Sequence, residues 1–263
     1  MQRFAYHRPS SLAEAVRLLK ESRGSLLAGG QSLIPAMKHG LASPSALVSL
    51  GAVSELRSVR KERADLVVGA MTTHAAVADA PEVRSTIPAL ATLAGGIGDP
   101  QVRNCGTIGG SVAHADPAAD YPAALIGCGA TVVTDQREIP ADDFFRGAFT
   151  TSLWAGEIIT AVKFPVPERA AYAKFASPAS RYALVGVMVA TRGKDVRVAV
   201  TGAGPAVFRQ RDMEAALTRK FAGESLTGIA QTAAGLLSDL EASAEYRAHL
   251  VGVMARRAVE SCR

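Results

Sequence analysis

Apolar residues recur at two spacings in the first part of the chain, and these spacings predict its helices and strands. Ser11 and Glu14 form a Ser-x-x-Glu capping box, and apolar residues then repeat at helical spacing over residues 12–19. Further helices are predicted at residues 31–38, 73–78 and 85–94. Short apolar runs predict strands at residues 25–28, 46–50, 130–134 and 157–164, and a hairpin that pairs residues 56–59 with residues 66–69 around a charged turn at 60–63.

The pattern changes after Phe164, where Pro165 and Pro167 interrupt the last of these runs. Beyond the prolines, apolar runs predict a three-stranded meander at residues 172–175, 183–191 and 196–201. Helical spacing then predicts helices at residues 213–217, 228–237 and 244–261. The sequence therefore predicts an α+β fold with two domains, residues 1–166 and residues 167–263, of which the second is a small sheet with helices.

Bulk composition is that of an ordinary globular protein. Hydrophobic residues make up 48% of the 263 residues and charged residues 20%. The longest apolar run, residues 183–190, is far shorter than the ~20 residues that a membrane-spanning helix needs, and it is expected to be a buried strand. The N-terminus has no apolar stretch of the signal-peptide type. We therefore expect a cytoplasmic protein without a membrane span.

Charge and cysteine content narrow the function classes. Residues 1–164 carry 15 basic and 15 acidic side chains, and residues 165–263 carry 14 and 9, so the net charge of +5 comes from the C-terminal part. The basic residues are scattered rather than clustered with aromatic ones, which argues against a nucleic-acid partner. Cys105, Cys128 and Cys262 are odd in number and widely spaced, which argues against disulfides and against a zinc or iron–sulfur site. Cys128 is expected to be buried, and Cys105 to be more exposed.

A first glycine turn, residues 28–32, joins a predicted strand to a predicted helix. Its residues are Ala28, Gly29, Gly30, Gln31 and Ser32. Glycine allows close approach of the backbone to a ligand, free amides at the start of a helix attract a phosphate, and Ser32 adds a hydroxyl group. Taken alone, the segment is explained more simply as a tight turn that needs glycine.

A second glycine turn, residues 107–111, offers similar chemistry. Its residues are Thr107, Ile108, Gly109, Gly110 and Ser111. The small residues, bare amides and two hydroxyls suit a pyrophosphate. Downstream, Asp116 and Asp120 are able to accept hydrogen bonds from ribose or flavin groups. A helix cap before Pro117 is the simpler role for Asp116. Asp120 is expected inside that helix, where function and solvent exposure are equally good explanations.

Neither turn matches a familiar nucleotide fingerprint. The strand–glycine–helix–strand order of residues 25–50 lacks the Gly-x-Gly-x-x-Gly spacing, and no acidic residue ends the strand at Leu50, as a Rossmann unit requires. No Gly-Lys-Ser/Thr motif is present, which excludes a P-loop. Two phosphate-compatible turns in one domain still favour a single extended ligand, such as a dinucleotide.

Several segments together resemble one known family. They are Ala-Gly-Gly-Gln-Ser-Leu-Ile-Pro at residues 28–35, the stretches at residues 98–104, 107–111 and 114–122, Lys-Phe at 174–175, residues 182–189, and Ser-Ala-Glu-Tyr-Arg at 243–247. These segments resemble the two flavin loops, the start of the C-terminal domain and the final helix of the FAD-binding medium subunits of molybdenum hydroxylases. This is the family of the carbon-monoxide and xanthine dehydrogenases. The resemblance covers essentially the whole chain.

The resemblance implies a fold and a cofactor. The first domain would be an FAD-binding domain of the vanillyl-alcohol-oxidase (PCMH) type, with noncovalent FAD whose pyrophosphate lies against both glycine turns. Asp120 matches an acidic FAD-contacting position, Ile159 an apolar position beside the flavin, and Lys174 a basic position near the ring. Tyr182 is a candidate for stacking on the isoalloxazine. Simpler roles are strand core for Ile159, a solvated surface for Lys174 and a buried core position for Tyr182.

The resemblance also implies partners. A large subunit would oxidise substrate at a molybdenum cofactor, a small subunit would carry two [2Fe–2S] clusters, and FAD in this chain would pass electrons to an external acceptor, in a dimer of heterotrimers. Such a chain needs no metal ligand and no catalytic acid, base or nucleophile of its own. The substrate and the terminal acceptor stay open.

Three other functions compete with this one. A self-contained FAD-dependent oxidoreductase of the same flavin fold would need its own substrate pocket. A metal-dependent hydrolase would use His114, Asp116 and Asp120 as hard-cation ligands, although His114 is explained more simply as a loop residue. A nonenzymatic nucleotide-binding module would bind its ligand without redox change.

Overall fold

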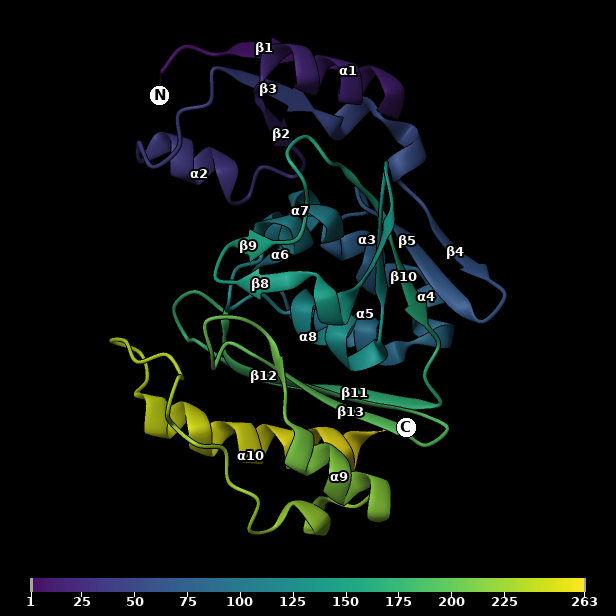
Figure 1. The fold of residues 1–263 in the computed structure, drawn as a ribbon, viewed down its shortest axis with the longest axis vertical. Coiled ribbons are helices and arrows are strands. Elements are labelled where there is room, and N and C mark those ends of the chain that lie inside the picture. Colours follow the sequence, from purple (N-terminus) through teal and green to yellow (C-terminus); the bar gives the residue numbers. More distant parts are fainter. Residues whose placement is uncertain (1, 263) are drawn as a thin grey trace.

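The computed structural model describes residues 2–262 as three tiers stacked along the long axis of the molecule (Figure 1). The N-terminal tier, the central tier and the C-terminal tier follow one another in chain order. Among the described residues, no helix combines the length and the apolar character needed to cross a membrane.

The N-terminal tier is a parallel sheet of three short strands in the order β1-β3-β2. Its elements are β1 (Ala5–His7), α1 (Leu12–Ser22), β2 (Ser25–Leu27), α2 (Leu33–Lys38) and β3 (Ala46–Ser49). The Ser11 hydroxyl accepts a hydrogen bond from the amide of Glu14 at 3.2 Å, so the predicted cap of α1 is confirmed. Because β2 ends at Leu27, the first glycine turn starts at its carboxyl end.

The central tier is an antiparallel sheet of five strands in the order β4-β5-β10-β6-β7. The strands are β4 (Val59–Glu62), β5 (Asp65–Gly69), β6 (Thr131–Thr134), β7 (Glu138–Pro140) and β10 (Ile159–Pro165). A small hairpin of β8 (Phe145–Gly147) and β9 (Thr150–Thr151) follows β7. The 3-10 helices along the chain are η1 (Leu50–Ala52), η2 (Ser54–Leu56), η3 (Ala141–Asp143) and η4 (Gly223–Leu226).

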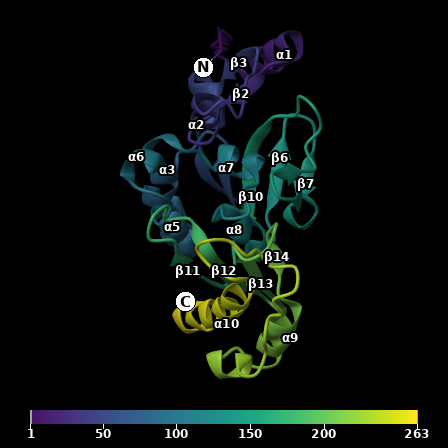
Figure 2. The ribbon, with the colours of Figure 1, turned by 90° about the vertical axis from the view of Figure 1, so that its left-hand side faces the viewer.

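Six helices lie between β5 and β6 in the sequence. They are α3 (His74–Asp79), α4 (Pro81–Thr86), α5 (Pro88–Gly95), α6 (Pro100–Cys105), α7 (Ile108–His114) and α8 (Tyr121–Cys128). Figure 2 shows α3, α5 and α6 on the side of the tier away from β6 and β7. Every residue of α8 is buried, because this helix lies between the central sheet and the sheet of the C-terminal tier.

The C-terminal tier has an antiparallel sheet in the order β11-β12-β13-β14. Its elements are β11 (Arg169–Ala176), β12 (Ala183–Arg192), β13 (Asp195–Thr201), β14 (Phe208–Arg209), α9 (Arg211–Arg219) and α10 (Ala244–Ser261). Successive side chains of β12 point to opposite faces of the sheet, so this strand contributes to two hydrophobic cores. Val185, Val187 and Val189 pack with α10, whereas Met188 and Ala190 pack with the central tier. This explains why its apolar run is buried throughout.

Polar contacts also hold the C-terminal tier to the central one. The Arg197 guanidinium donates to the carbonyl of Ile126 at 3.1 Å and to the Asp142 carboxylate at 2.9 Å. The Thr201 hydroxyl donates to the carbonyl of Ala119 at 2.6 Å, and the Gly202 amide donates to the carbonyl of Pro117 at 2.8 Å. The ends of the C-terminal strands therefore fix the turn at residues 116–120.

The predicted α+β class is confirmed, but some elements differ from the prediction. Residues 228–237 form no helix, because Gly228 and Gly235 adopt φ values of +82° and +81°. The predicted helix at residues 85–94 is split between α4 and α5 at Pro88. Residues 60–62 belong to β4, and the turn lies at Arg63. The predicted three strands of the C-terminal sheet gain a short fourth, β14.

Candidate functional site

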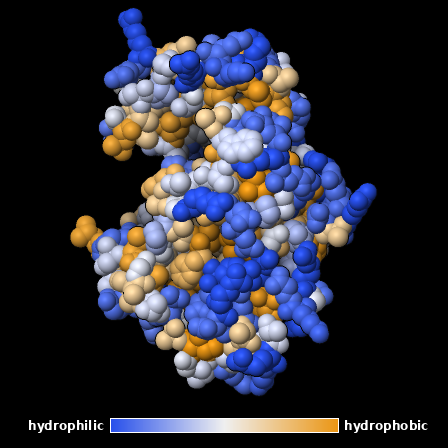
Figure 3. All heavy atoms as spheres, viewed as in Figure 1, coloured by the Kyte–Doolittle hydropathy of each residue, from blue (hydrophilic) through white to orange (hydrophobic). Residues whose placement is uncertain are grey.

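A cavity of about 650 Å³ lies between the N-terminal and central tiers. Figure 3 shows the surface indented on its left-hand side between these tiers. The predicted site residues that line the cavity are Ala28, Gly29, Gly30, Gln31, Ser32, Thr107, Gly109, Gly110, Ser111, Asp120, Ile159 and Tyr182. The other two, Ile108 and Lys174, are not part of its lining. Ile108 is fully buried in the core of the central tier.

The two glycine turns meet in this cavity although they are about 80 positions apart in the sequence. A β-carbon added at Gly29 would lie 2.1 Å from the carbonyl oxygen of Cys105 and 2.8 Å from the α-carbon of Gly106. A β-carbon added at Gly110 would lie 3.4 Å from the β-carbon of Ala28. Only glycine permits this approach at position 29. Gly30 is also required, because its φ is +73°.

The two turns differ in how their amides are used. Within residues 2–262, the amides of Gly29, Gly30, Gln31 and Ser32 donate to no protein acceptor. The hydroxyl of Ser32 makes no capping bond to α2. The first glycine turn therefore lines the cavity with residues whose amides are free to bind a ligand.

The expectation of bare amides is wrong for the second glycine turn. The amide of Ile108 donates to the carbonyl of Thr72 at 3.1 Å, and that of Gly109 donates to the carbonyl of Ala70 at 2.9 Å. The amide of Gly110 donates to the hydroxyl of Thr107 at 3.2 Å. The second turn thus offers small side chains and hydroxyl groups, while the amides of Ile108 and Gly109 fasten it to the segment that directly follows β5.

Asp120 joins the cavity to the C-terminal tier. Its carboxylate is buried and accepts hydrogen bonds from the Tyr172 hydroxyl at 2.5 Å and from the Lys174 ammonium at 3.0 Å, both on β11. Lys174 also donates to the carbonyl of Gly96 at 3.1 Å. Burial raises the pKa of Asp120, and Lys174 and Tyr172 oppose that rise. The simpler alternative for Lys174, a solvated surface position, is wrong, since its side chain is only 10% exposed and is paired with Asp120.

The helix expected after Asp116 does not start there. The Asp116 carboxylate accepts a hydrogen bond from the amide of Ala118 at 2.9 Å within a turn, and α8 begins only at Tyr121. Asp120 consequently precedes the helix instead of lying inside it, and it is buried instead of solvent-exposed. The turn brings both carboxylates to the cavity wall.

The remaining wall combines apolar and aromatic side chains. Ile159 is buried at the start of β10 and lines the cavity beside Ile158. Tyr182 lines it from the loop before β12 and is 44% exposed, so the simpler expectation of a buried core tyrosine is wrong. Burial of its hydroxyl and the nearby carboxylates of Asp116 and Asp120 raise the pKa of Tyr182.

An ion pair between a buried carboxylate and a partly exposed arginine lies just before the strand that carries Ile159. Glu157 accepts hydrogen bonds from both Nε and Nη2 of Arg137, at 2.9 and 3.0 Å, and from the Thr134 hydroxyl at 2.8 Å. Although burial alone would raise the pKa of Glu157, these hydrogen bonds and that from the amide of Trp154 lower it. This pair was not predicted from the sequence, because its members lie in two loops about 20 positions apart.

The sequence reasoning also missed His74, the first residue of α3. Its side chain lines the cavity and is 5% exposed. Its ring lies 5.3 Å from the ring of Tyr121, centroid to centroid. The signal in the sequence was a single histidine after the capping residue Thr73, which does not by itself indicate a cavity wall.

His114, Asp116 and Asp120, the metal ligands of the hydrolase alternative, do not form a metal site. The His114 ring packs at an angle of 50° against the ring of Phe149, with centroids 5.0 Å apart, and Asp120 is paired with Lys174. Across residues 2–262, no three or more His, Cys, Asp and Glu side chains are grouped to hold a metal ion. The three cysteines are free, and Cys128 is buried and Cys105 exposed as expected.

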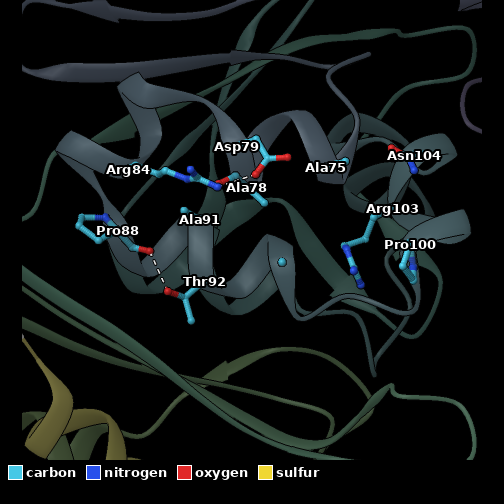
Figure 4. A pocket seen from close by; sticks show the side chains of 11 residues that line it. Ala75, Ala78, Asp79, Arg84, Pro88, Ala91, Thr92, Pro100, Arg103 and Asn104 are labelled. Atoms are coloured by element: carbon cyan, nitrogen blue, oxygen red, sulfur yellow. Dashed lines mark hydrogen bonds and ion pairs between the residues drawn. The ribbon is translucent and has the colours of Figure 1, made fainter.

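A second hollow of about 600 Å³ lies among α3, α4, α5 and α6. Its floor is made of small residues such as Ala75, Ala78 and Ala91 (Figure 4). Its two arginines are engaged within the protein. Arg84 pairs with Asp79, and Arg103 donates to the carbonyls of residues 97 and 98 at 3.0 and 3.1 Å. This hollow contains neither glycine turn, and we therefore take the first cavity as the candidate site.

Comparison with known families divides the chain into two matching parts. Residues 2–167 match the family described as the FAD binding domain in molybdopterin dehydrogenase. Residues 170–262 match the family described as the CO dehydrogenase flavoprotein C-terminal domain.

Individual relatives are similar over almost their whole length. The carbon monoxide dehydrogenase medium chain of Hydrogenophaga pseudoflava is 36% identical over 277 residues, covering 98% of this chain and 96% of the relative. The nicotine 6-hydroxylase medium subunit of Paenarthrobacter nicotinovorans is 37% identical over 269 residues, covering 97% and 95%. The solved structure of reconstituted CO dehydrogenase from Oligotropha carboxidovorans matches with a TM-score of 0.89 and 34% identity, over 98% of this chain and 97% of that one. These names place the relatives in multi-subunit enzymes.

Proposed function

Because the chain belongs to the FAD-binding medium subunits of molybdenum hydroxylases, we propose that it takes electrons from [2Fe–2S] clusters of a partner subunit and passes them through FAD to an external acceptor. The chain is an oxidoreductase subunit with an FAD-binding domain. The observation that carries the proposal is the meeting of the two glycine turns, with the free amides of the first facing one cavity.

The cavity suits the phosphate end of FAD on physical grounds. A pyrophosphate needs several donors and no bulky side chain, and the amides of residues 29–32 with the Ser32 hydroxyl supply the donors. Residues 107–111 would add the hydroxyls of Thr107 and Ser111 and a surface without large side chains. The cavity volume also lies in the range of roughly 300–1,000 Å³ that is typical of cofactor sites.

The other end of the cavity suits a ring with a polar edge. We assign Ile159 and Tyr182 to contacts with the isoalloxazine and Asp120 to a hydrogen bond with a polar group of FAD. Lys174 would act through Asp120, whose carboxylate it pairs with at 3.0 Å. The Glu157–Arg137 ion pair would keep Ile159 in position.

When bound, FAD supplies a group that accepts single electrons and delivers pairs. This chain's own residues bind and orient that group and keep water from it. For that role the chain requires no nucleophile and no acid–base pair of its own.

We further propose the partners and the domain division. The partners would be a large molybdenum-cofactor subunit and a small [2Fe–2S] subunit in a dimer of heterotrimers, in line with the subunit names of the relatives. Residues 1–166 would form the FAD-binding domain and residues 167–263 the C-terminal domain. Three free cysteines are in keeping with a cytoplasmic location, where thiols stay reduced.

The test uses the complex purified from cells that express the chain with its genomic neighbours. We expect three kinds of subunit and one FAD per copy of this chain, released intact by acid and identified by chromatography. Reduction of the flavin by substrate should require the partner subunits. Steady turnover of an organic donor by the chain alone would instead support a self-contained oxidoreductase, and a chain purified without flavin would refute the proposal.

A further inference from the structure

His74 lies at the border between the FAD cavity and the second glycine turn. Its amide donates to the carbonyl of Gly106 at 2.9 Å. A β-carbon added at Gly106 would lie 2.5 Å from Nε2 of His74 and 2.8 Å from its Cδ2. The imidazole edge that carries Nε2 therefore packs on Gly106, the residue directly before Thr107, and both His74 and Gly106 line the cavity.

The imidazole has no hydrogen-bond partner within the described chain. Its Nδ1 is fully buried and unpartnered, whereas Nε2 lies at the edge of the ring that packs on Gly106. A buried N–H without an acceptor is rarer in proteins than a buried acceptor without a donor. The proton therefore belongs on Nε2, at the edge that borders the cavity.

The surroundings keep this ring neutral and fixed. Burial, followed by the positive charge of Arg103, lowers the pKa of His74 to about 4. The Tyr121 ring packs at an angle of 48° to the imidazole. A rigid, neutral ring with one available N–H is suited to hydrogen bonding with an oxygen atom of a ligand, because it brings no net charge to the cavity.

We propose that His74 is an FAD-contacting residue whose Nε2–H donates a hydrogen bond to an acceptor oxygen of the cofactor. The inference rests on the proposed FAD site and adds to it a donor from α3 that the two glycine turns do not provide. A phosphate oxygen and a flavin carbonyl share the required chemistry. The position beside Gly106 puts the donor next to the turn that we assign to the pyrophosphate.

The test compares two substitutions of similar size, His74→Gln and His74→Met. Both remove the aromatic ring that packs on Tyr121, but only glutamine keeps an N–H near the position of Nε2. FAD is removed from the native complex, and its rebinding is followed by quenching of flavin fluorescence. We expect His74→Met to raise the Kd for FAD about tenfold and His74→Gln to stay within about threefold of the wild type.

Tyr121→Phe is the matched control. The Tyr121 hydroxyl is also buried and unpartnered, so its removal should leave the Kd for FAD unchanged and raise the melting temperature of the FAD-free protein. Competition with ADP identifies the acceptor. A weaker affinity of His74→Met for ADP assigns the contact to a phosphate, and an unchanged affinity assigns it to the flavin ring.

The outcomes separate this inference from the proposed function. Wild-type protein that rebinds no FAD would refute the FAD site itself. Wild-type binding with equal affinities for His74→Met and His74→Gln would overturn only the role of His74. A loss of FAD by Tyr121→Phe as large as that of His74→Met would likewise overturn it, because packing and not the donor would then explain the effect.

Discussion

Substitution of Gly29 tests the close approach between the first glycine turn and Cys105 and Gly106, the residues that lead into the second. In Gly29→Ala the new β-carbon would lie 2.1 Å from the carbonyl oxygen of Cys105 and 2.8 Å from its carbonyl carbon. Both are backbone atoms, so no side-chain rotation relieves the clash and the turns must separate by about 1 Å. Such overpacking costs about 1–3 kcal/mol of folding free energy.

The effect on FAD should exceed the effect on folding. A separation of the turns displaces the free amides of residues 29–32 from the phosphates, and charge-assisted hydrogen bonds contribute about 1.5–3 kcal/mol each. Loss of one or two such bonds raises the Kd for FAD on the order of 100-fold. The assay is flavin content per chain, followed by FAD titration and denaturant unfolding of the FAD-free protein.

The control for this variant is Gly252→Ala in α10. A β-carbon at Gly252 meets no atom within 4 Å, so we expect unchanged FAD affinity and a gain of about 0.5–1 kcal/mol in stability. If Gly29→Ala binds FAD as tightly as the wild type, the close approach of Gly29 to the backbone of Cys105 is not required for FAD binding. Equal loss of FAD in both variants would show that the effect is not local.

The remaining predictions concern charge, pH and the interface between the central and C-terminal tiers. Gly110→Asp adds a carboxylate beside the proposed phosphate position, and the two negative charges would repel each other. We therefore expect this variant to purify with far less flavin than Gly110→Ala. Full flavin content in the aspartate variant would contradict the assignment of residues 107–111 to the phosphates. Burial and Arg103 lower the pKa of His74 from 6.5 to about 4, so the stability that depends on its neutral ring is present above pH 6.5 and is lost as the pH falls toward 4. The lowered pKa corresponds to about 3 kcal/mol of unfolding free energy. His74→Gln should therefore lose less unfolding free energy than the wild type between pH 6.5 and pH 4. Parallel curves of unfolding free energy against pH for the two proteins would refute this prediction. Arg197→Met removes the hydrogen bonds to Ile126 and Asp142, which connect the C-terminal tier to the central tier. We expect the unfolding free energy measured in urea titrations to fall by about 1–2 kcal/mol. An unchanged value would mean that these bonds do not stabilise the contact between the two tiers.

Local patterns in the sequence were sufficient for most of the fold. The apolar run at residues 183–190 predicts a strand buried on both faces, and β12 is buried because its alternate residues serve two cores. The helix predicted at residues 244–261 matches α10. The helix predicted at residues 228–237 fails, because two glycines with positive φ outweigh the apolar spacing between them.

Long-range contacts explain what the sequence could not predict in the site. Glycine turns indicate bare amides, but the amides at residues 108 and 109 are satisfied by carbonyls of Thr72 and Ala70, which local sequence does not reveal. For Lys174 the resemblance implied a position near the flavin ring, and a solvated surface was the simpler alternative. Its pairing with Asp120 depends on how β11 packs against the central tier.

The most direct test of the central claim is an experimental map of the native complex with its cofactor. We predict density for FAD in the cavity between the N-terminal and central tiers, with the pyrophosphate within hydrogen-bond distance of the amides of residues 29–32 and beside residues 107–111. A diphosphate held elsewhere, for example in the hollow among α3, α4, α5 and α6, would contradict the account, as would a cavity occupied by a ligand other than FAD.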